Sequence, residues 1–198
     1  MKRFTAVLFS ILLAAAVPSL RGQAIHSAAS RQASITIGGT ASIFQPDYEG
    51  AWTSQPSAGY YYPVAQAGSY PLFGAGAYVD VKFTRWVQIE AEGRWLRFNQ
   101  FDGIYQDNYL IGPRVPIHRF GKATVYGKAL IGDAKMHFDS LGDHGEFTTL
   151  AFGGGVDYKL TKRFSIRALD AEYQYWPKWG NSTLSPYGAS VGIGYKIF

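Results

Sequence analysis

The chain of 198 residues contains no cysteine. This absence excludes a disulfide scaffold, a thiolate metal site, a cysteine nucleophile and a lipid-modified N-terminal cysteine. Charge is scarce as well: 17% of the residues are Asp, Glu, Lys or Arg, against about 25% in a typical soluble domain. The sequence also lacks a sustained heptad pattern and a three-residue glycine period, which excludes a coiled coil and a collagen.

Aromatic residues are abundant instead. Phe, Trp and Tyr make up 16% of the chain, and the hydrophobic fraction is 47%. Disordered chains are poor in aromatics and rich in charge, so disorder is excluded. The sequence therefore describes a folded chain whose apolar residues must be buried or placed in lipid.

The N-terminus has the pattern of an export signal. Residues 1–3 are basic at positions 2 and 3, residues 4–17 form an apolar run, and small residues surround Ala24. This order predicts a secretory signal peptide over 1–24, followed by a tail over 25–33. The alternative is an N-terminal anchor helix, but the run is shorter than the roughly 20 residues that such a helix needs. Without residues 1–24 the net charge falls from +5 to +2. No basic stripe remains, so we expect no nucleic-acid partner.

After residue 33 the apolar residues alternate at a period of two, which is typical of strands with one apolar face. We predict eight strands over 34–44, 72–83, 86–98, 107–117, 122–134, 147–160, 163–176 and 185–198. Short connections are expected at 84–85, 118–121 and 161–162, and long ones at 45–71, 99–106, 135–146 and 177–184. Short and long connections alternate, which is typical of an all-β, eight-stranded antiparallel up-and-down transmembrane β-barrel over 34–198.

Aromatic residues gather near both ends of the predicted strands, as in the two interfacial girdles of such barrels. The girdle at the short turns would contain Phe83, Trp86, Phe120, Phe164 and Phe198, and the other Tyr70, Trp95, Phe98, Tyr109, Tyr175, Trp176 and Tyr187. The alternative is a soluble lipocalin-like barrel with its apolar face inward. The low charged fraction argues against it.

The export signal, the eight alternating strands and the ending Val-Gly-Ile-Gly-Tyr-Lys-Ile-Phe over 191–198 resemble the small bacterial outer-membrane barrels, the OmpA-barrel and OmpX-like family. In that family the last strand ends on an aromatic residue with apolar residues at alternate positions before it. Tyr195, Ile197 and Phe198 would carry this signal, although Tyr195 and Phe198 fall on opposite faces here.

The resemblance implies a cell-envelope protein of the porin family, exported by a Sec-type route to the bacterial outer membrane. Its expected partners are outer-membrane lipid and, during biogenesis, periplasmic chaperones and the barrel-assembly machinery. The short turns and both termini would lie in the periplasm.

Polar residues in the middle of a strand should face the lumen, because lipid accepts no unpaired polar face. The predicted lumen set holds six basic and six acidic residues: Asp80, Lys82, Glu90, Glu92, Arg94, Arg114, Lys128, Asp157, Lys159, Arg167, Asp170 and Glu172. The interior of an eight-stranded barrel is just wide enough for side chains. We therefore expect interlocked salt bridges and not an open ion pathway. Salt bridges are also favoured over the alternative that Glu90 and Glu92 act as a catalytic acid–base pair. A bulge near Ala168 and Leu169 is needed to keep both halves of that strand in register.

The connections offer two further sets of candidates. Loop 45–71 is rich in aromatic residues that favour recognition, and we expect Tyr48, Trp52, Tyr60, Tyr61 and Tyr62 to bind a surface ligand or to cover the barrel mouth. The stretch 137–144 contains the residue types of a serine hydrolase or a metal site, but in no diagnostic spacing. These candidates are His137, Asp139, Ser140, Asp143 and His144.

The sequence thus predicts a non-enzymatic envelope protein: a structural barrel with surface binding through its long loops. We expect no catalytic residue, cofactor or metal site. A narrow pore for ions or small solutes is the first alternative, and a lipid-modifying enzyme at the barrel rim is the second.

Overall fold

The computed structural model describes residues 34–46, 71–84, 86–98, 104–138, 143–179 and 182–197, all within the compact unit Arg31–Phe198. The strands are β1 (Ser34–Gln45), β2 (Leu72–Lys82), β3 (Gln88–Phe98), β4 (Tyr105–Phe120), β5 (Ala123–Phe138), β6 (Asp143–Lys159), β7 (Phe164–Trp179), β8 (Ser182–Leu184) and β9 (Tyr187–Lys196). The described residues include no helix long and apolar enough to cross a membrane, a finding that concerns helices only. The predicted export signal and tail lie outside the described residues.

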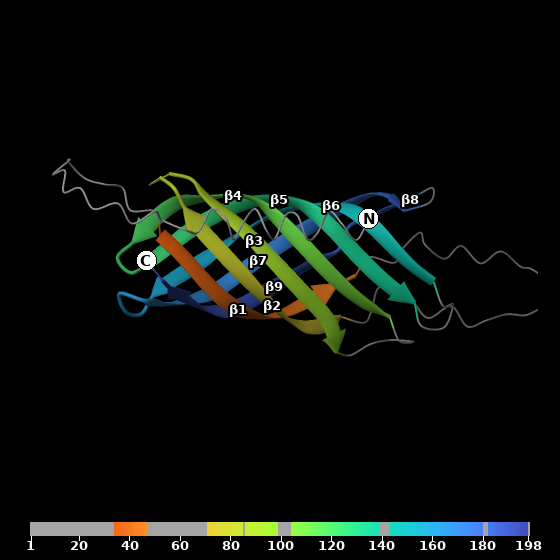
Figure 1. Ribbon diagram of the computed structural model, residues 1–198, viewed down its shortest axis with the longest axis horizontal. Helices are drawn as coiled ribbons and strands as arrows, with labels where there is room; N and C mark the ends of the chain where they lie inside the picture. The colour runs from red at the N-terminus through yellow and green to blue at the C-terminus, as the bar shows by residue number, and fades with distance from the viewer. Residues whose placement is uncertain are drawn as a thin grey trace, which may run out of the picture. The chain divides into compact units, whose positions relative to one another are not determined.

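The eight long strands close into a barrel in which every pairing is antiparallel. Consecutive strands pair from β1 to β7, β7 pairs with β9, and β9 returns to β1. The three-residue β8 pairs with β7 alone and extends one end of the wall. In Figure 1 the β4–β5 turn and the β6–β7 turn lie at the same end of the barrel as the end of β9, while β8 lies at the opposite end. The predicted eight-stranded antiparallel barrel is confirmed.

Three connections differ from the prediction. The predicted long loop over 177–184 contains the end of β7 and the whole of β8. The predicted turn over 118–121 shortens to Gly121 and Lys122, with Gly121 at a φ of 58°, where glycine carries no steric penalty.

The predicted long loop over 135–146 is wrong, because β5 and β6 continue through most of it. Lys135 pairs with Glu146 at 2.6 Å across the two strands. Opposite charges on paired strands stabilise this extension. In β5 the apolar alternation also continues beyond the predicted end, from Ala134 to Met136.

The predicted irregularity in β7 is confirmed. Val156 pairs with Leu169 but Asp157 pairs with Arg167, so Ala168 is the extra residue of a β-bulge. The insertion shifts the alternation by one position. As a result β7 turns both Arg167 and Asp170 into the lumen.

The outer face of the barrel is apolar. Ile37, Ile131, Phe152, Val191 and Ile193 each expose between 43% and 60% of their surface, while charged side chains in the middle of the strands, such as Glu90 and Lys128, are buried inside. This distribution is the reverse of that in a soluble barrel, so the lipocalin-like alternative is wrong.

The aromatic girdles are largely present on this outer face. Exposed aromatics at the short-turn end are Phe83, Trp86, Phe120 and Phe164, and at the opposite end Trp95, Phe98, Tyr109, Tyr175 and Tyr187. Tyr70 and Phe198 lie outside the described residues. Trp176 is a correction: it is fully buried inside the barrel, because it shares the inward alternation of Glu172 and Gln174.

Candidate functional site

The lumen is crossed by a cluster of ten ionisable side chains, the lumen network. It joins six strands, β2 to β7, and contains Asp80, Glu90, Glu92, Arg94, Arg114, Lys128, Asp157, Arg167, Asp170 and Glu172. All ten belong to the predicted lumen set. The other two members of that set, Lys82 and Lys159, form no ion pair within the described part of the chain.

Lys128 of β5 is the centre of one half of the lumen network. Its Nζ lies 3.2 Å from Glu90, 3.0 Å from Glu92, 2.9 Å from Asp170 and 2.9 Å from Glu172. Four acceptors surround an ammonium group that has three N–H donors. The Lys128 side chain is completely buried, so its charge depends on these carboxylates.

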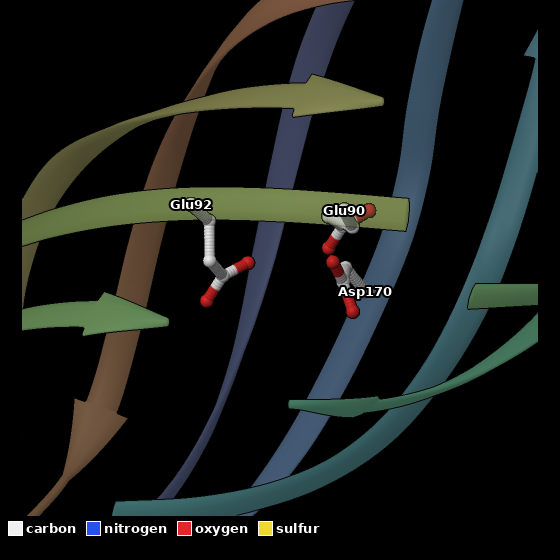
Figure 2. Close-up of side chains that lie close together, drawn as sticks. All are labelled: Glu90, Glu92 and Asp170. Atoms are coloured by element: carbon white, nitrogen blue, oxygen red, sulfur yellow. The ribbon is translucent and has the colours of Figure 1, made fainter. Parts of the chain in front are cut away.

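The same carboxylates resemble a metal site. Figure 2 shows Glu90 and Asp170 turned toward one another, with Glu92 on the same strand as Glu90. One oxygen from each lies within 4.8 Å of the other two. However, the Lys128 ammonium already makes close ion pairs with all three. It supplies the positive charge that a metal ion would bring.

Two arginines organise the other half of the network. Arg114 Nη1 donates to Asp80 at 2.6 Å, and Arg114 Nη2 donates to Asp157. Arg167 Nη2 donates to Glu90 at 2.7 Å and to Asp80 at 3.2 Å. These bonds connect β2, β3, β4, β6 and β7 across the lumen.

Arg94 adds the third guanidinium, nearer to the long-loop end. It donates to Glu172 at 3.0 Å across the lumen and to Glu92 at 2.5 Å on its own strand. Charge-assisted hydrogen bonds of this kind are the strongest that side chains make. Removing one partner leaves the other charged and buried.

Aromatic rings support the three guanidinium groups. Arg114 lies 3.6 Å from the ring centroid of Tyr126 and Arg167 3.7 Å from that of Tyr78. Arg94 lies 4.1 Å from the ring centroid of Phe44. Desolvated cation–π contacts at these distances are stabilising. These rings were not among the predicted site residues, although Tyr78 and Tyr126 share the inward alternation of Asp80 and Lys128.

Glycines make room for one of these rings. A Cβ atom at Gly38 would collide with the Tyr78 ring, and a Cβ at Gly194 would lie 2.5 Å from its hydroxyl oxygen. Because both strands lack side chains here, Tyr78 can lie across β1 and β9 and place its ring beneath Arg167.

A neutral polar layer follows the lumen network toward the long-loop end. Asn108 Nδ2 donates to Gln174 Oε1 at 3.1 Å, and Trp176 Nε1 donates to the same oxygen at 2.9 Å. Gln106 Nε2 donates to Asn108 Oδ1 at 2.8 Å. Gln174 Nε2 in turn donates to Glu172 at 2.8 Å and so joins this layer to the network.

An apolar cap lies beyond the amide layer. Its buried members are Ala134, Met136, Trp176 and Leu184, with Ile104 and Phe147 packed against them. The rings of Phe147 and Trp176 stack at a centroid distance of 5.8 Å. Leu184 belongs to β8, which explains why this short strand folds back on β7. The lumen therefore changes from ionic to amide to apolar along its length.

The remaining predicted candidates lie at the long-loop end of β5 and β6 or outside the described residues, and Asp143 pairs with Phe138 in the β5–β6 ladder. The ring of His137 stacks on Tyr105 at 4.4 Å, and His137 pairs with His144 in the β5–β6 ladder. Asp139 and Ser140 lie outside the described residues, as do all five aromatic candidates of loop 45–71: Tyr48, Trp52, Tyr60, Tyr61 and Tyr62. Surface binding by that loop therefore stays a prediction.

Two of the three residues of the predicted C-terminal signal, Tyr195 and Ile197, lie in or next to the last strand, β9. Tyr195 pairs with Phe164, and their rings are 5.1 Å apart; its hydroxyl accepts a hydrogen bond from Arg163. The Ile197 amide donates to the Ile35 carbonyl oxygen at 2.8 Å. Phe198 lies outside the described residues.

Several solved structures are similar to this chain. Neisserial surface protein A is 13% identical, with 81% of this chain and 96% of that chain covered and a TM-score of 0.53. The N-terminal β-barrel domain of Pseudomonas aeruginosa OprF is 13% identical over 84% of this chain and 100% of that one, with a TM-score of 0.49. Ail of Yersinia pestis is 20% identical over 83% and 97%, with a TM-score of 0.44. At these identities the likeness concerns the fold alone.

Sequence comparison gives the family directly. No curated protein matches the sequence, but the family model for the outer membrane protein beta-barrel domain matches residues 7–196. This match covers nearly the whole chain and agrees with the closed barrel and its apolar outer face. The chain belongs to the outer membrane protein β-barrel family and is located in the bacterial outer membrane.

Proposed function

We propose that this protein is a non-enzymatic structural barrel whose lumen is closed to ions and solutes. The observation that carries the proposal is the lumen network, which joins opposite walls of the barrel through buried charges. An ion pathway would need a continuous file of water along the axis. Arg114, Lys128 and Arg167 instead fill the cross-section with paired side chains, each of which is at least 95% buried.

The layers beyond the network support the same proposal. An ion that passed Arg94 and Glu172 would meet the amide layer and then the apolar cap around Trp176. Dehydration in an apolar constriction is costly for any ion. Three successive layers of different chemistry would therefore have to open together before the lumen could conduct.

Single-channel recording tests this proposal. The mature protein is refolded, inserted into a planar lipid bilayer and checked for a folded barrel by heat-modifiable gel migration. We expect no discrete openings from the native sequence. As a positive control, the variant Lys128→Ala/Gln174→Ala/Trp176→Ala removes a large side chain from each of the three layers at once and should raise the baseline current. Steady discrete openings from the native protein would contradict the closed barrel and favour the pore alternative.

The proposal includes the route to the membrane. We propose that residues 1–24 direct export and are removed, and that chaperones and the barrel-assembly machinery recognise the last strand. Mass spectrometry of the protein purified from outer membranes would give the mature N-terminus, which we expect at Ile25. A chain that retained residues 1–24 would contradict the export signal and favour the anchor-helix alternative.

A further inference from the structure

The short-turn end of the barrel is strongly cationic. Its described residues are 34–36, 82–84, 86–88, 118–124, 158–165 and 195–197, and they include no Asp or Glu. They do include seven basic residues: Lys82, Arg119, Lys122, Lys159, Lys162, Arg163 and Lys196. The carboxylates of the lumen lie deeper, so the charged side chains described at this end are all positive.

Four of these cations face the lumen axis and form a group that we call the mouth ring: Lys82, Arg119, Lys159 and Lys196. Paired residues of neighbouring strands lie on the same face of a sheet. Thr36 pairs with both Asp80 and Lys196, which places Lys196 on the inward side. Thr124 pairs with both Asp157 and Arg119, which places Arg119 on the inward side as well.

The other two members of the mouth ring follow from alternation along single strands. Lys82 is two residues beyond Asp80 on β2, and Lys159 is two residues beyond Asp157 on β6. Residues at this spacing share a face. Lys82 also lies within the range of the electrostatic repulsion from Arg119, Lys159 and Lys196.

The strand ends hold the mouth ring in position. The Lys159 amide donates to the Lys122 carbonyl oxygen at 2.9 Å, and the Lys196 amide donates to the Arg163 carbonyl oxygen at 2.7 Å. The backbone of two ring members is thus fixed to the neighbouring turns. The mouth ring makes no ion pair with any described residue, and like charges at short range repel. An anion on the axis would remove that repulsion.

We propose that the mouth ring binds a small multivalent oxyanion of the phosphate class. Lysine ammonium groups are compact, rotatable donors that suit phosphate oxygens, and Arg119 can add a paired contact. The lumen network sets the depth of the site. It begins at Asp157, two residues deeper on β6 than Lys159, and its six carboxylates outnumber its four cations, so it repels an anion that moves further in. The site therefore holds an anion at the mouth and does not pass it through.

The position of the mouth ring favours a small anion over a membrane surface. A bilayer headgroup at the rim would first meet the three basic residues of the turns, Lys122, Lys162 and Arg163, which are exposed there. The mouth-ring cations point to the axis instead. The phosphate can come from a free ion or from one headgroup that reaches into the mouth, and the experiment separates these sources.

The test compares two triple variants with equal loss of charge. The protein is reconstituted in phosphatidylcholine nanodiscs, and inorganic pyrophosphate is titrated while binding is measured by calorimetry. Lys82→Gln/Lys159→Gln/Lys196→Gln removes the three lysines of the mouth ring and leaves Arg119, and we expect affinity to fall about tenfold or more. The matched control Lys122→Gln/Lys162→Gln/Arg163→Gln should change affinity less than about threefold, since only long-range attraction is lost.

Side-chain ammonium resonances of the native protein provide a readout that needs no variant. Pyrophosphate should shift the signals of Lys82, Lys159 and Lys196 more than that of Lys162. Phosphatidylglycerol is then added to the nanodiscs. If it weakens pyrophosphate binding to the native protein but not to the mouth-ring variant, the site binds a lipid headgroup. If it leaves pyrophosphate binding unchanged, the site binds a free anion. Equal weakening by both triple variants, or no pyrophosphate binding to the native protein, would overturn the proposed site.

Discussion

The lumen contains two groups of cations whose surroundings differ sharply. In the lumen network Arg94, Arg114, Lys128 and Arg167 are buried, and each contacts at least two carboxylates. In the mouth ring, at the short-turn ends of β2, β4, β6 and β9, four cations make no ion pair with any described residue. Burial explains the difference. A charge removed from water must be paired, whereas a hydrated charge need not be.

The two groups also differ in net charge. The lumen network has four cations and six carboxylates, a formal charge of −2 if all are ionised, while the mouth ring has four cations and no carboxylate. Because carboxylates are in excess, the loss of one buried cation should destabilise the network strongly. The same excess makes a single carboxylate more dispensable than a single cation.

The largest expected effect is the loss of a network cation. Lys128→Met leaves four carboxylates without their shared ammonium group, and we expect the free energy of unfolding to fall by about 3–5 kcal/mol. Urea titration of the protein in lipid vesicles measures it. Lys196→Met in the mouth ring is the matched control and should leave the urea midpoint unchanged. Equal losses in the two variants would show that burial does not separate the two groups.

The outer face of the same wall sharpens the comparison. Ala77→Arg puts a cation on the lipid side of β2, where no carboxylate can reach it, and should cost about 2–4 kcal/mol. Leu160→Arg in the β6–β7 turn is the control and should cost about 0–1 kcal/mol, because that residue lies near the interface. The same vesicle titration measures both. If Ala77→Arg were neutral, the assignment of the lipid-facing side would be wrong.

Two adjacent glycines test the support beneath Arg167. A methyl group at Gly38 collides with the Tyr78 ring, so Gly38→Ala should cost about 1–3 kcal/mol through forced displacement of that ring. At Gly39 the nearest atom to a new methyl group is the Gly76 oxygen at 3.8 Å, so Gly39→Ala should be tolerated. Near-UV circular dichroism would report the displacement. An unchanged spectrum and stability for Gly38→Ala would show that the Tyr78–Arg167 contact contributes little.

The smallest effect is expected from a carboxylate. Glu92→Gln keeps the shape of the side chain and an acceptor oxygen, while Arg94 retains Glu172 and Lys128 retains three other carboxylates. We expect a change below about 1 kcal/mol by urea titration. A loss as large as that of Lys128→Met would show that the excess negative charge is itself required.

Alternation along each strand predicted which side chains face inward, and the conflict between Ile166 and Leu169 predicted the bulge. Depth was not predictable in this way. Lys82 and Lys159 have the same inward alternation as Asp80 and Asp157, but they lie at the mouth. Their depth depends on the stagger between strands, which a single strand does not reveal.

Aromatic residues were the other source of error. Trp176 falls near a strand end, where the sequence favours a girdle, yet it closes the apolar cap with Leu184. Tyr78 and Tyr126 have the right alternation for the lumen, but nothing in the sequence shows that a guanidinium group lies above each ring. Such contacts join strands far apart in the chain, and only the closed barrel brings them together.

The ion pairs of the lumen network also bear on how the barrel assembles. Arg167 reaches Asp80 and Glu90, which precede it by 87 and 77 residues. In an open sheet these charges remain in water, and they meet only when the last strands complete the circle. Closure and desolvation are therefore a single event. A wall that closed one residue out of register would bury unmatched charges, so the network selects the correct register at the final step of folding.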